Sequence, residues 1–161
     1  MVTDEKKQYI EEMVEKYSDM VYRLAIARTR KKEDAEDVFQ EVFYKFSKNT
    51  LDFENETHEK AWFIRVTINC SKNLLSTAWN RKTVALETEI EFTEKENGEV
   101  YFEVLKLPLK YRTVIQLFYY ERLSIEEIGH ILKTNPNTIK THLARARLQL
   151  KSKLEGGFDN E

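Results

Sequence analysis

The sequence predicts an all-helical protein of two small domains joined by a flexible acidic linker. Three observations support this fold class. The 161 residues include only four Gly and two Pro, which is too few for the many turns of a β-rich fold. Apolar residues recur at three- and four-residue spacing over most of the chain, as they do on amphipathic helices. An acidic stretch without that spacing separates the two helical parts.

The first half of the chain predicts three helices. A long helix ends near Arg28, because apolar residues follow helical spacing up to that point. Asp34 is a candidate N-cap for a second helix, whose apolar stripe runs to Phe46. The polar residues 48–58 predict a loop. A third amphipathic helix is expected from about Glu59 to Trp79.

Residues 83–100 form the predicted linker. Acidic and apolar residues alternate over 86–92, which is also a strand pattern. No partner strand is evident elsewhere, and a lone strand is not stable. The predicted organisation is therefore a first domain over 1–82, a second over 101–155 and a tail from 156 to 161.

The second domain begins with two helices separated by a break. A short helix is expected from about Phe102 to Leu105. Leu107 and Pro108 interrupt it, since proline cannot continue a helix. A further helix then runs to about Tyr120, with apolar residues at core positions.

Residues 123–154 carry the signature of a helix-turn-helix. Ser124 and Glu127 have the spacing of a capping box at a helix start. Gly129 on that helix would allow another helix to approach closely. After a short turn, Asn135 is a good N-cap and Pro136 suits the first helical position, where its missing N–H costs nothing. A short helix, a short turn and a sharply started second helix make this motif.

The second helix of the motif has three distinct faces when it is plotted at 100° per residue. Its buried stripe comprises Ile139, Leu143, Ala146, Leu150 and Leu154. Its polar face, suited to base edges, comprises Thr138, Thr141, His142 and Arg145. A basic flank suited to phosphates comprises Lys140, Arg147 and Lys151.

The distribution of charge agrees with two nucleic-acid contacts. The net charge is −2, which taken alone argues against nucleic acid. However, residues 60–86 and residues 138–154 each hold five Lys or Arg and no Asp or Glu. Two basic segments in an otherwise acidic chain are what two contacts with phosphates require. Two solvated helix faces would give the same pattern, so charge alone does not decide.

Composition also excludes several classes of protein. The single cysteine, Cys70, allows no internal disulfide and indicates a cytoplasmic protein with an inert, packed thiol. No apolar run reaches the ~20 residues needed to span a membrane, and the charged N-terminus is not a signal peptide. The histidines are scattered, and no glycine loop for phosphates occurs. We therefore expect no enzyme activity, no metal and no cofactor.

Motifs in both halves resemble those of extracytoplasmic-function sigma factors of the sigma-70 family. In the second half these are Leu107–Arg112, Leu123–Ile128 and Asn137–Arg147. In the first half, residues 34–43 resemble the family's polymerase-binding helix and residues 61–69 its minus-ten helix. Lys133 stands where the family usually has the glycine of the turn, and His142 stands where Arg is common.

The resemblance implies three sets of functional residues. The set that contacts a coiled coil on the largest polymerase subunit is Asp34, Asp37, Gln40, Glu41 and Phe43. The set that faces minus-ten promoter DNA is Lys60, Trp62, Arg65, Asn69, Lys72 and Asn73. The set that reads the minus-thirty-five element is Asn137, Thr138, Lys140, Thr141, His142 and Arg145. The loop over 48–58 lies where the family traps an unpaired base.

The resemblance also implies the partners of the chain. They are core RNA polymerase and promoter DNA, with an anti-sigma factor as a further candidate. Two other interpretations stay open from the residues themselves. One is a helix-turn-helix regulator with an N-terminal helical sensor domain, and the other is a protein-binding helical module whose basic faces are incidental.

Overall fold

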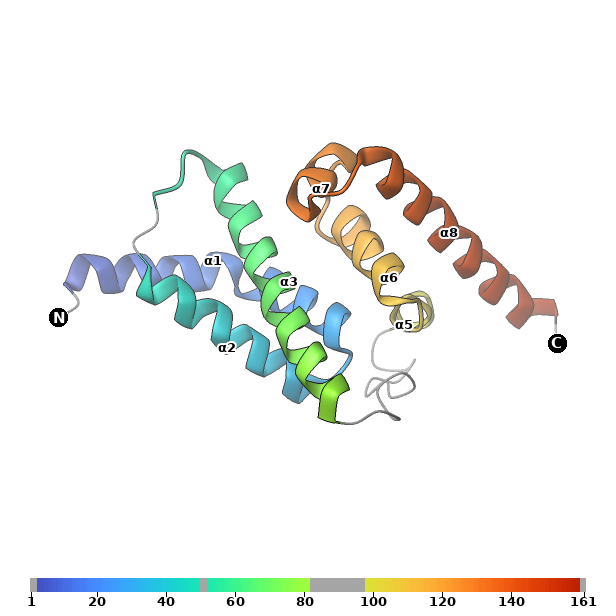
Figure 1. Ribbon diagram of the computed structural model, residues 1–161, viewed down its shortest axis with the longest axis horizontal. Coiled ribbons are helices and arrows are strands. Elements are labelled where there is room, and N and C mark those ends of the chain that lie inside the picture. Colours follow the sequence, from blue (N-terminus) through green and yellow to red (C-terminus); the bar gives the residue numbers. More distant parts are fainter. Residues whose placement is uncertain (1–2, 50–51, 82–97, 160–161) are drawn as a thin grey trace. The chain divides into compact units, whose positions relative to one another are not determined.

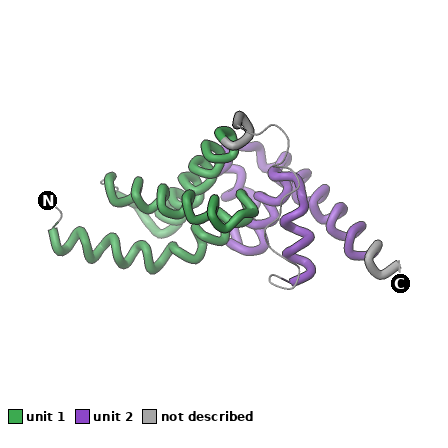
Figure 2. The backbone as a smooth tube through the Cα atoms, turned by 90° about the horizontal axis from the view of Figure 1, so that it is seen from below, with its two compact units in different colours: residues 1–86 green, residues 87–161 purple. Residues whose placement is uncertain are grey.

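The computed structural model describes residues 3–49, 52–81 and 98–159, and all of its regular elements in those ranges are helical. The chain divides into two compact units, Met1–Leu86 and Glu87–Glu161 (Figures 1 and 2). The all-helical prediction is therefore confirmed. Among the described helices, none has a stretch long and apolar enough to cross a lipid bilayer.

The first unit consists of α1 (Asp4–Thr29), α2 (Lys32–Lys48) and α3 (Glu56–Arg81), which pack against one another (Figure 1). The prediction of three helices in this part is correct. The prediction that Asp34 is the N-cap of α2 is wrong. The helix begins at Lys32, and Asp34 lies in its first turn, where a carboxylate favours the positive end of the helix dipole.

Helix α3 begins three residues earlier than the sequence predicts. Its start is explained by Asn55, whose side-chain oxygen accepts a hydrogen bond of 2.9 Å from the backbone N–H of His58, as an N-cap does. Backbone N–H of Glu54 in turn donates to Nδ1 of His58 at 3.3 Å. The end of the predicted loop is thus an ordered helix start.

Phe63 forms the centre of the first unit's core. Its ring is fully buried and contacts an aromatic ring from each of the other two helices, Tyr17 of α1 at 4.4 Å and Phe46 of α2 at 5.2 Å between centroids. Cys70 is also buried on α3. Burial, and the nearby Glu41 carboxylate, raise the pKa of the Cys70 thiol to about 11, which agrees with an inert, packed thiol.

The second unit consists of α5 (Glu99–Leu105), α6 (Leu109–Ile115), the π-helical turn η1 (Gln116–Tyr120), α7 (Ile125–Leu132) and α8 (Pro136–Asp159). Helices α5, α6 and α7 all pack against α8. The break at Leu107 and Pro108 lies where the sequence predicts it, between α5 and α6.

The widened turn η1 was not predicted. Its hydrogen bonds span five and six residues, from Glu121 N–H to the Gln116 carbonyl and from Leu123 N–H to the Leu117 carbonyl, each at 3.0 Å. Inside the turn, the buried amide of Gln116 donates to the buried Glu121 carboxylate at 2.9 Å. This pairing satisfies two polar groups that would otherwise be costly to bury.

The predicted helix-turn-helix is present. Ser124 and Glu127 form the complete capping box at the start of α7, and α8 begins at Pro136. Gly129 allows the close approach of the turn and of the first residue of α8, Pro136. A Cβ at this position would lie 2.7 Å from the Thr134 carbonyl oxygen. Lys133 ends α7 with a φ of +55°, a conformation that favours glycine.

The predicted boundaries of the linker and tail are only partly within the described residues. Most of the predicted linker lies in 82–97, outside them. Its last two residues form the start of α5, which begins at Glu99. The predicted tail is shorter than expected, since α8 continues to Asp159.

Truncation of Phe63 should destabilise the first unit. We expect Phe63→Ala to lower its free energy of unfolding by about 3–5 kcal/mol, through loss of burial and the cavity left behind. Urea unfolding followed by tryptophan fluorescence measures this, because both tryptophans lie on α3. Tyr44→Ala, at a side chain that is 62% exposed, is the control and should change stability by less than about 0.5 kcal/mol. Equal stability of the two variants would contradict the central role of Phe63.

Candidate nucleic-acid interface

Helix α8 presents the polar face that the sequence predicts. Ile139, Leu143 and Ala146 are buried against the rest of the second unit. This orients the opposite side of the helix toward solvent. Five of the six residues predicted for the minus-thirty-five element are exposed, namely Asn137, Thr138, Lys140, Thr141 and Arg145. Lys140 lies apart from the others on the basic flank, at the angle where its charge suits a phosphate.

His142 is the half-buried member of this face. Its ring packs edge-on against Tyr111 at 5.6 Å, and Nζ of Lys110 lies 5.2 Å from the Tyr111 ring. Burial lowers the pKa of His142 below its ordinary value, and the positive charges of Lys110 and Arg145 lower it further. The imidazole is therefore neutral at pH 7, with one nitrogen able to donate and the other to accept.

Arg147 has a different environment from the one expected for a phosphate-binding side chain. Its Nε donates to the hydroxyl of Tyr119 at 2.7 Å. Its guanidinium also lies 5.6 Å from the ring of Phe118 and 5.5 Å from that of Tyr119. Arg147 therefore links α8 to η1. The spacing of residues along α8 alone does not reveal this arrangement.

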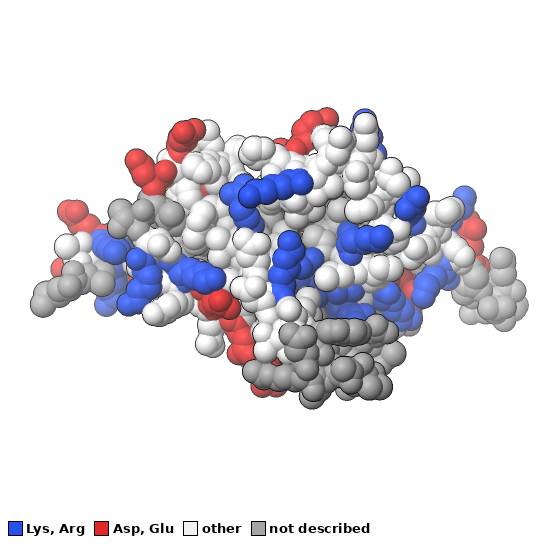
Figure 3. All heavy atoms as spheres, in the orientation of Figure 1, with Lys and Arg blue, Asp and Glu red and all other residues white. Residues whose placement is uncertain are grey.

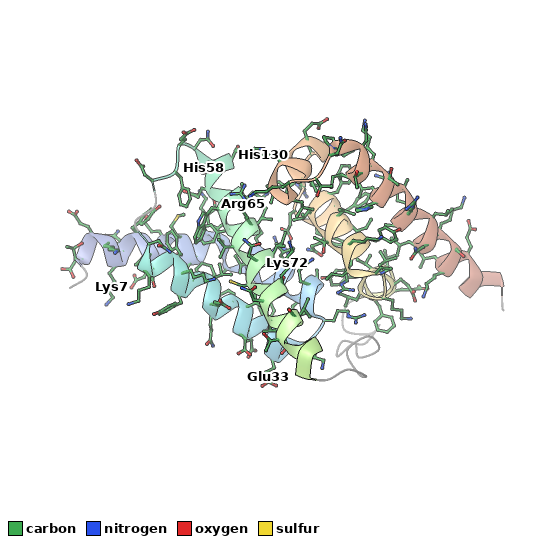
Figure 4. The ribbon with its side chains drawn as sticks, viewed as in Figure 1. Lys7, Glu33, His58, Arg65, Lys72 and His130 are labelled. Atoms are coloured by element: carbon green, nitrogen blue, oxygen red, sulfur yellow. The ribbon has the colours of Figure 1, made fainter. Side chains whose placement is uncertain are left out.

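Most of the residues predicted for minus-ten DNA share one face of α3. Trp62, Arg65, Asn69, Lys72 and Asn73 fall within about 100° of one another on the helical wheel. Trp62 and Arg65 are half-buried, and the other three are exposed. Lys60 lies on roughly the opposite side of α3, so the structure does not bring it together with this set. Figure 4 shows Arg65 and Lys72 along α3, and Figure 3 shows basic side chains over the same helix.

An aromatic group lies at the start of α3, beside the basic face. The ring of Phe53 lies 5.6 Å from His58 and 6.1 Å from Trp62. Trp62 also packs edge-on against Phe46 at 5.8 Å. Phe53 and Trp62 are half-buried and His58 is exposed, so the group has edges that are open to solvent. The family resemblance predicted that the loop over 48–58 traps an unpaired base, but it did not identify Phe53.

Helix α2 exposes an acidic stripe, but its aromatic member differs from the predicted one. Asp37 and Gln40 are exposed, and Asp34 and Glu41 are half-exposed. Phe43 is buried in the core, where it packs 5.6 Å from Phe63.

Tyr44 is the aromatic side chain that the stripe exposes. It is 62% exposed, seven residues after Asp37 and three after Glu41, so it lies on the same stripe. Helical spacing from Asp37 could have identified it.

The second unit also has an apolar cavity of about 620 Å³. Its lining comes from α5, α6, η1 and α8, and includes Val104, Ile115, Tyr120, Leu150 and Leu154. The basic side chains of Arg147 and Lys151 line it as well. Within the described ranges, no group of three or more His, Cys, Asp or Glu is placed to hold a metal ion.

Comparison with known families identifies both units. The family model for Sigma-70 region 2 matches residues 13–81, and the model for Sigma-70 region 4 matches residues 98–150. The RNA polymerase sigma factor SigV of Bacillus subtilis is 34% identical over 80% of this chain and 83% of its own length. The ECF sigma factor SigW of the same organism is 30% identical, over 89% and 87% respectively.

The chain belongs to the ECF group of the sigma-70 family. As a sigma factor it directs core RNA polymerase to specific promoters for transcription initiation. Family membership excludes the two other interpretations, because neither a sensor-linked regulator nor an incidental helical module accounts for region 2 followed by region 4.

Solved structures share the fold of this sigma factor. The sigma factor RpoE from Bartonella quintana, solved with the anti-sigma factor NepR, superimposes with a TM-score of 0.73 at 18% identity, covering 95% of this chain and 98% of that one. CnrH, solved with the cytosolic domain of CnrY, gives a TM-score of 0.70 at 21% identity, covering 93% and 90%. At these identities the likeness concerns the fold.

The pKa of His142 provides a test of the geometry around α8. A proton NMR titration should place it below the ordinary value of about 6.5, and Lys110→Met should raise it by removing one repulsive charge. Because the unfolded chain takes up the proton first, the stability of the second unit should fall as pH drops below about 6.5. A titration midpoint at or above the ordinary value would contradict the packing of His142 on Tyr111.

Proposed function

We propose that three exposed helix faces of this sigma factor each bind a different partner or promoter element. The stripe on α2 binds core polymerase, the face of α3 engages minus-ten DNA, and the face of α8 reads the minus-thirty-five element. The observation that carries the proposal is that each helix buries one side while the opposite side carries the side chains suited to its partner. The sigma factor contributes no catalytic group of its own and acts in the cytoplasm, beside the polymerase.

The chemistry of α8 suits duplex DNA. Threonine hydroxyls, a neutral imidazole and a guanidinium can all bond base edges in the major groove. Arg145 is the strongest candidate, because arginine can donate two hydrogen bonds to one guanine. Lys140 supplies charge for a phosphate, which adds affinity without sequence preference.

The chemistry of α3 suits DNA that is opening. Arg65 and Lys72 attract the backbone, while Trp62 and Phe53 offer aromatic surface at the helix start. Unstacking a base costs a few kcal/mol. Stacking on an aromatic ring and contacts with phosphates recover this cost.

The stripe on α2 suits a basic helical partner. Asp37 and Glu41 provide negative charge, and the exposed ring of Tyr44 lies between them and Lys48, whose Nζ is 5.5 Å from the ring. We therefore assign the aromatic contact with polymerase to Tyr44, and give Phe43 the role of supporting α2 from beneath. Exposed aromatic residues with a polar tip are frequent anchors of protein interfaces.

We further propose that an anti-sigma factor holds this protein inactive. One of the similar structures, that of RpoE, is a sigma factor in complex with an anti-sigma factor. The apolar cavity along α5 and α8 offers such a partner a surface for its own apolar side chains. The sigma factor should give no promoter-specific transcription while the anti-sigma factor is bound, and its removal should restore transcription. An anti-sigma factor that leaves transcription unchanged would contradict this proposal.

Reconstitution with core RNA polymerase tests the main proposal. Purified sigma factor and core enzyme are supplied with a library of genomic fragments, and run-off transcripts are sequenced. Defined transcripts that require the sigma factor are expected, and their start sites reveal the two promoter elements. Retardation of duplex DNA by the sigma factor alone, without binding to core polymerase, would contradict it.

Arg145→Ala should weaken use of the identified promoters by about 1–3 kcal/mol, because it removes a bidentate contact with a base. The loss should concentrate at one position of the minus-thirty-five element when each base pair is varied. Lys140→Ala is the matched control and should weaken all variants to a similar degree, since a phosphate contact carries no base preference. Unchanged promoter choice with Arg145→Ala would exclude Arg145 as a base-reading residue.

Tyr44→Ala should weaken binding to core polymerase about tenfold or more, as expected for an aromatic interface anchor. Competition against labelled wild-type protein for core enzyme measures this directly. Glu15→Ala, at an exposed position of α1, should compete like the wild type. Full competition by Tyr44→Ala would remove Tyr44 from the interface.

A further inference from the structure

Hydrogen bonds from α1 hold the first turns of α3. Nζ of Lys16 lies 2.8 Å from a carboxylate oxygen of Glu56 and 2.8 Å from one of Glu59. The hydroxyl of Tyr17 donates to the same oxygen of Glu59. The ring of Tyr17 is stacked on Phe63, with 18° between the ring planes. We refer to Lys16, Tyr17, Glu56 and Glu59 as the Tyr17 cluster.

The bond between Tyr17 and Glu59 is the shielded part of the cluster. Tyr17 is 5% exposed, and the side chain of Glu59 is 14% exposed, against 85% for Glu56. Hydrogen bonds to a charged acceptor are stronger than hydrogen bonds between neutral groups. This advantage is smaller where water competes for the acceptor. Burial, together with the Glu59 carboxylate, raises the pKa of Tyr17 well above its ordinary value, so the hydroxyl remains a donor at all working pH values.

The segment held by the Tyr17 cluster carries the aromatic group described above. Glu56 and Glu59 flank His58, which packs against Phe53. Trp62 follows Glu59 by three residues and therefore lies close to it on the helix surface. The position of the first turns of α3 sets where the rings of His58 and Trp62 lie, and both contact Phe53.

We propose that Lys16, Tyr17 and Glu59 are positioning residues for promoter opening. They hold the first turns of α3 so that Phe53 and Trp62 keep the arrangement in which an unpaired base is trapped. They do so from the side of α3 that meets α1, through the bonds to Glu59, and the proposal assigns them no contact with DNA. The inference rests on the proposed function of α3 and adds α1 to the machinery that opens promoters.

Conservative variants separate this role from a general effect on folding. Tyr17→Phe removes the hydroxyl and keeps the ring that stacks on Phe63. Glu59→Gln keeps an acceptor for Tyr17 and removes the charge that pairs with Lys16. Tyr22→Phe is the matched control, because Tyr22 lies on the same helix and its ring packs on Phe39 of α2, 6.4 Å away.

The experiment follows promoter opening by the complete holoenzyme. Each variant is tested on a promoter identified by run-off transcription, once as a duplex and once with the minus-ten region already opened by mismatches. Reactivity of unpaired thymines toward permanganate gives the opening rate, and competition gives the affinity for core polymerase. Tyr17→Phe should open the duplex about tenfold more slowly, equivalent to about 1.4 kcal/mol, and the pre-opened template should bring it within about twofold of the wild type.

The remaining measurements support or overturn the proposal. Glu59→Gln should give a smaller defect of the same kind, and Tyr22→Phe should match the wild type on both templates. Core affinity should be unchanged in all three. Equal loss on both templates would show a general folding defect, and wild-type opening by Tyr17→Phe would show that the hydroxyl is dispensable; either result overturns the proposal. Absence of any promoter-specific transcript with the wild-type sigma factor would contradict the proposed function itself.

Discussion

The packing of Phe63 is the constraint on which the first unit depends. Its ring is the meeting point of three helices and is in contact with Tyr17, Phe43, Phe46 and Trp62. Interiors are packed densely and do not deform continuously. The position of Phe63 therefore fixes the rotation of α3 about its own axis. Once that rotation is set, the side that carries Asn69, Lys72 and Asn73 faces solvent.

The same logic governs the second unit, with aliphatic residues in place of aromatic ones. Ile139, Leu143 and Ala146 are buried along α8, while the capping box of α7 and the tight turn at Gly129 set where α8 begins. The hydrogen bond from Arg147 to Tyr119 then holds α8 against η1. In both units, most of the side chains proposed to meet DNA are exposed because the residues between them are buried in a core.

Local signals in the sequence were sufficient for the all-helical fold and for the helix-turn-helix. Ser124, Asn135 and Pro136 act on backbone groups within a few residues, so their effects are evident without the rest of the fold. Predictions that depended on contacts between different helices were less successful. Phe43 and Tyr44 are adjacent aromatic residues, and the resemblance alone pointed to Phe43, which packs on Phe63 in the core. The bond between Arg147 and Tyr119 joins side chains that are 28 residues apart in the sequence, which spacing along one helix cannot reveal.

The distribution of charge has a consequence for the two helices that we propose to face DNA. A net charge of −2 gives no overall attraction to DNA, and each basic face offers only a few phosphate contacts. Either face alone should therefore bind weakly at physiological salt. The proposed binding of α2 to polymerase would change this, because tethered contacts act at a high effective concentration and multiply their affinities when geometry allows both to form. The acidic surroundings of the two faces thus favour a protein that recognises promoters as part of the polymerase and ignores free DNA.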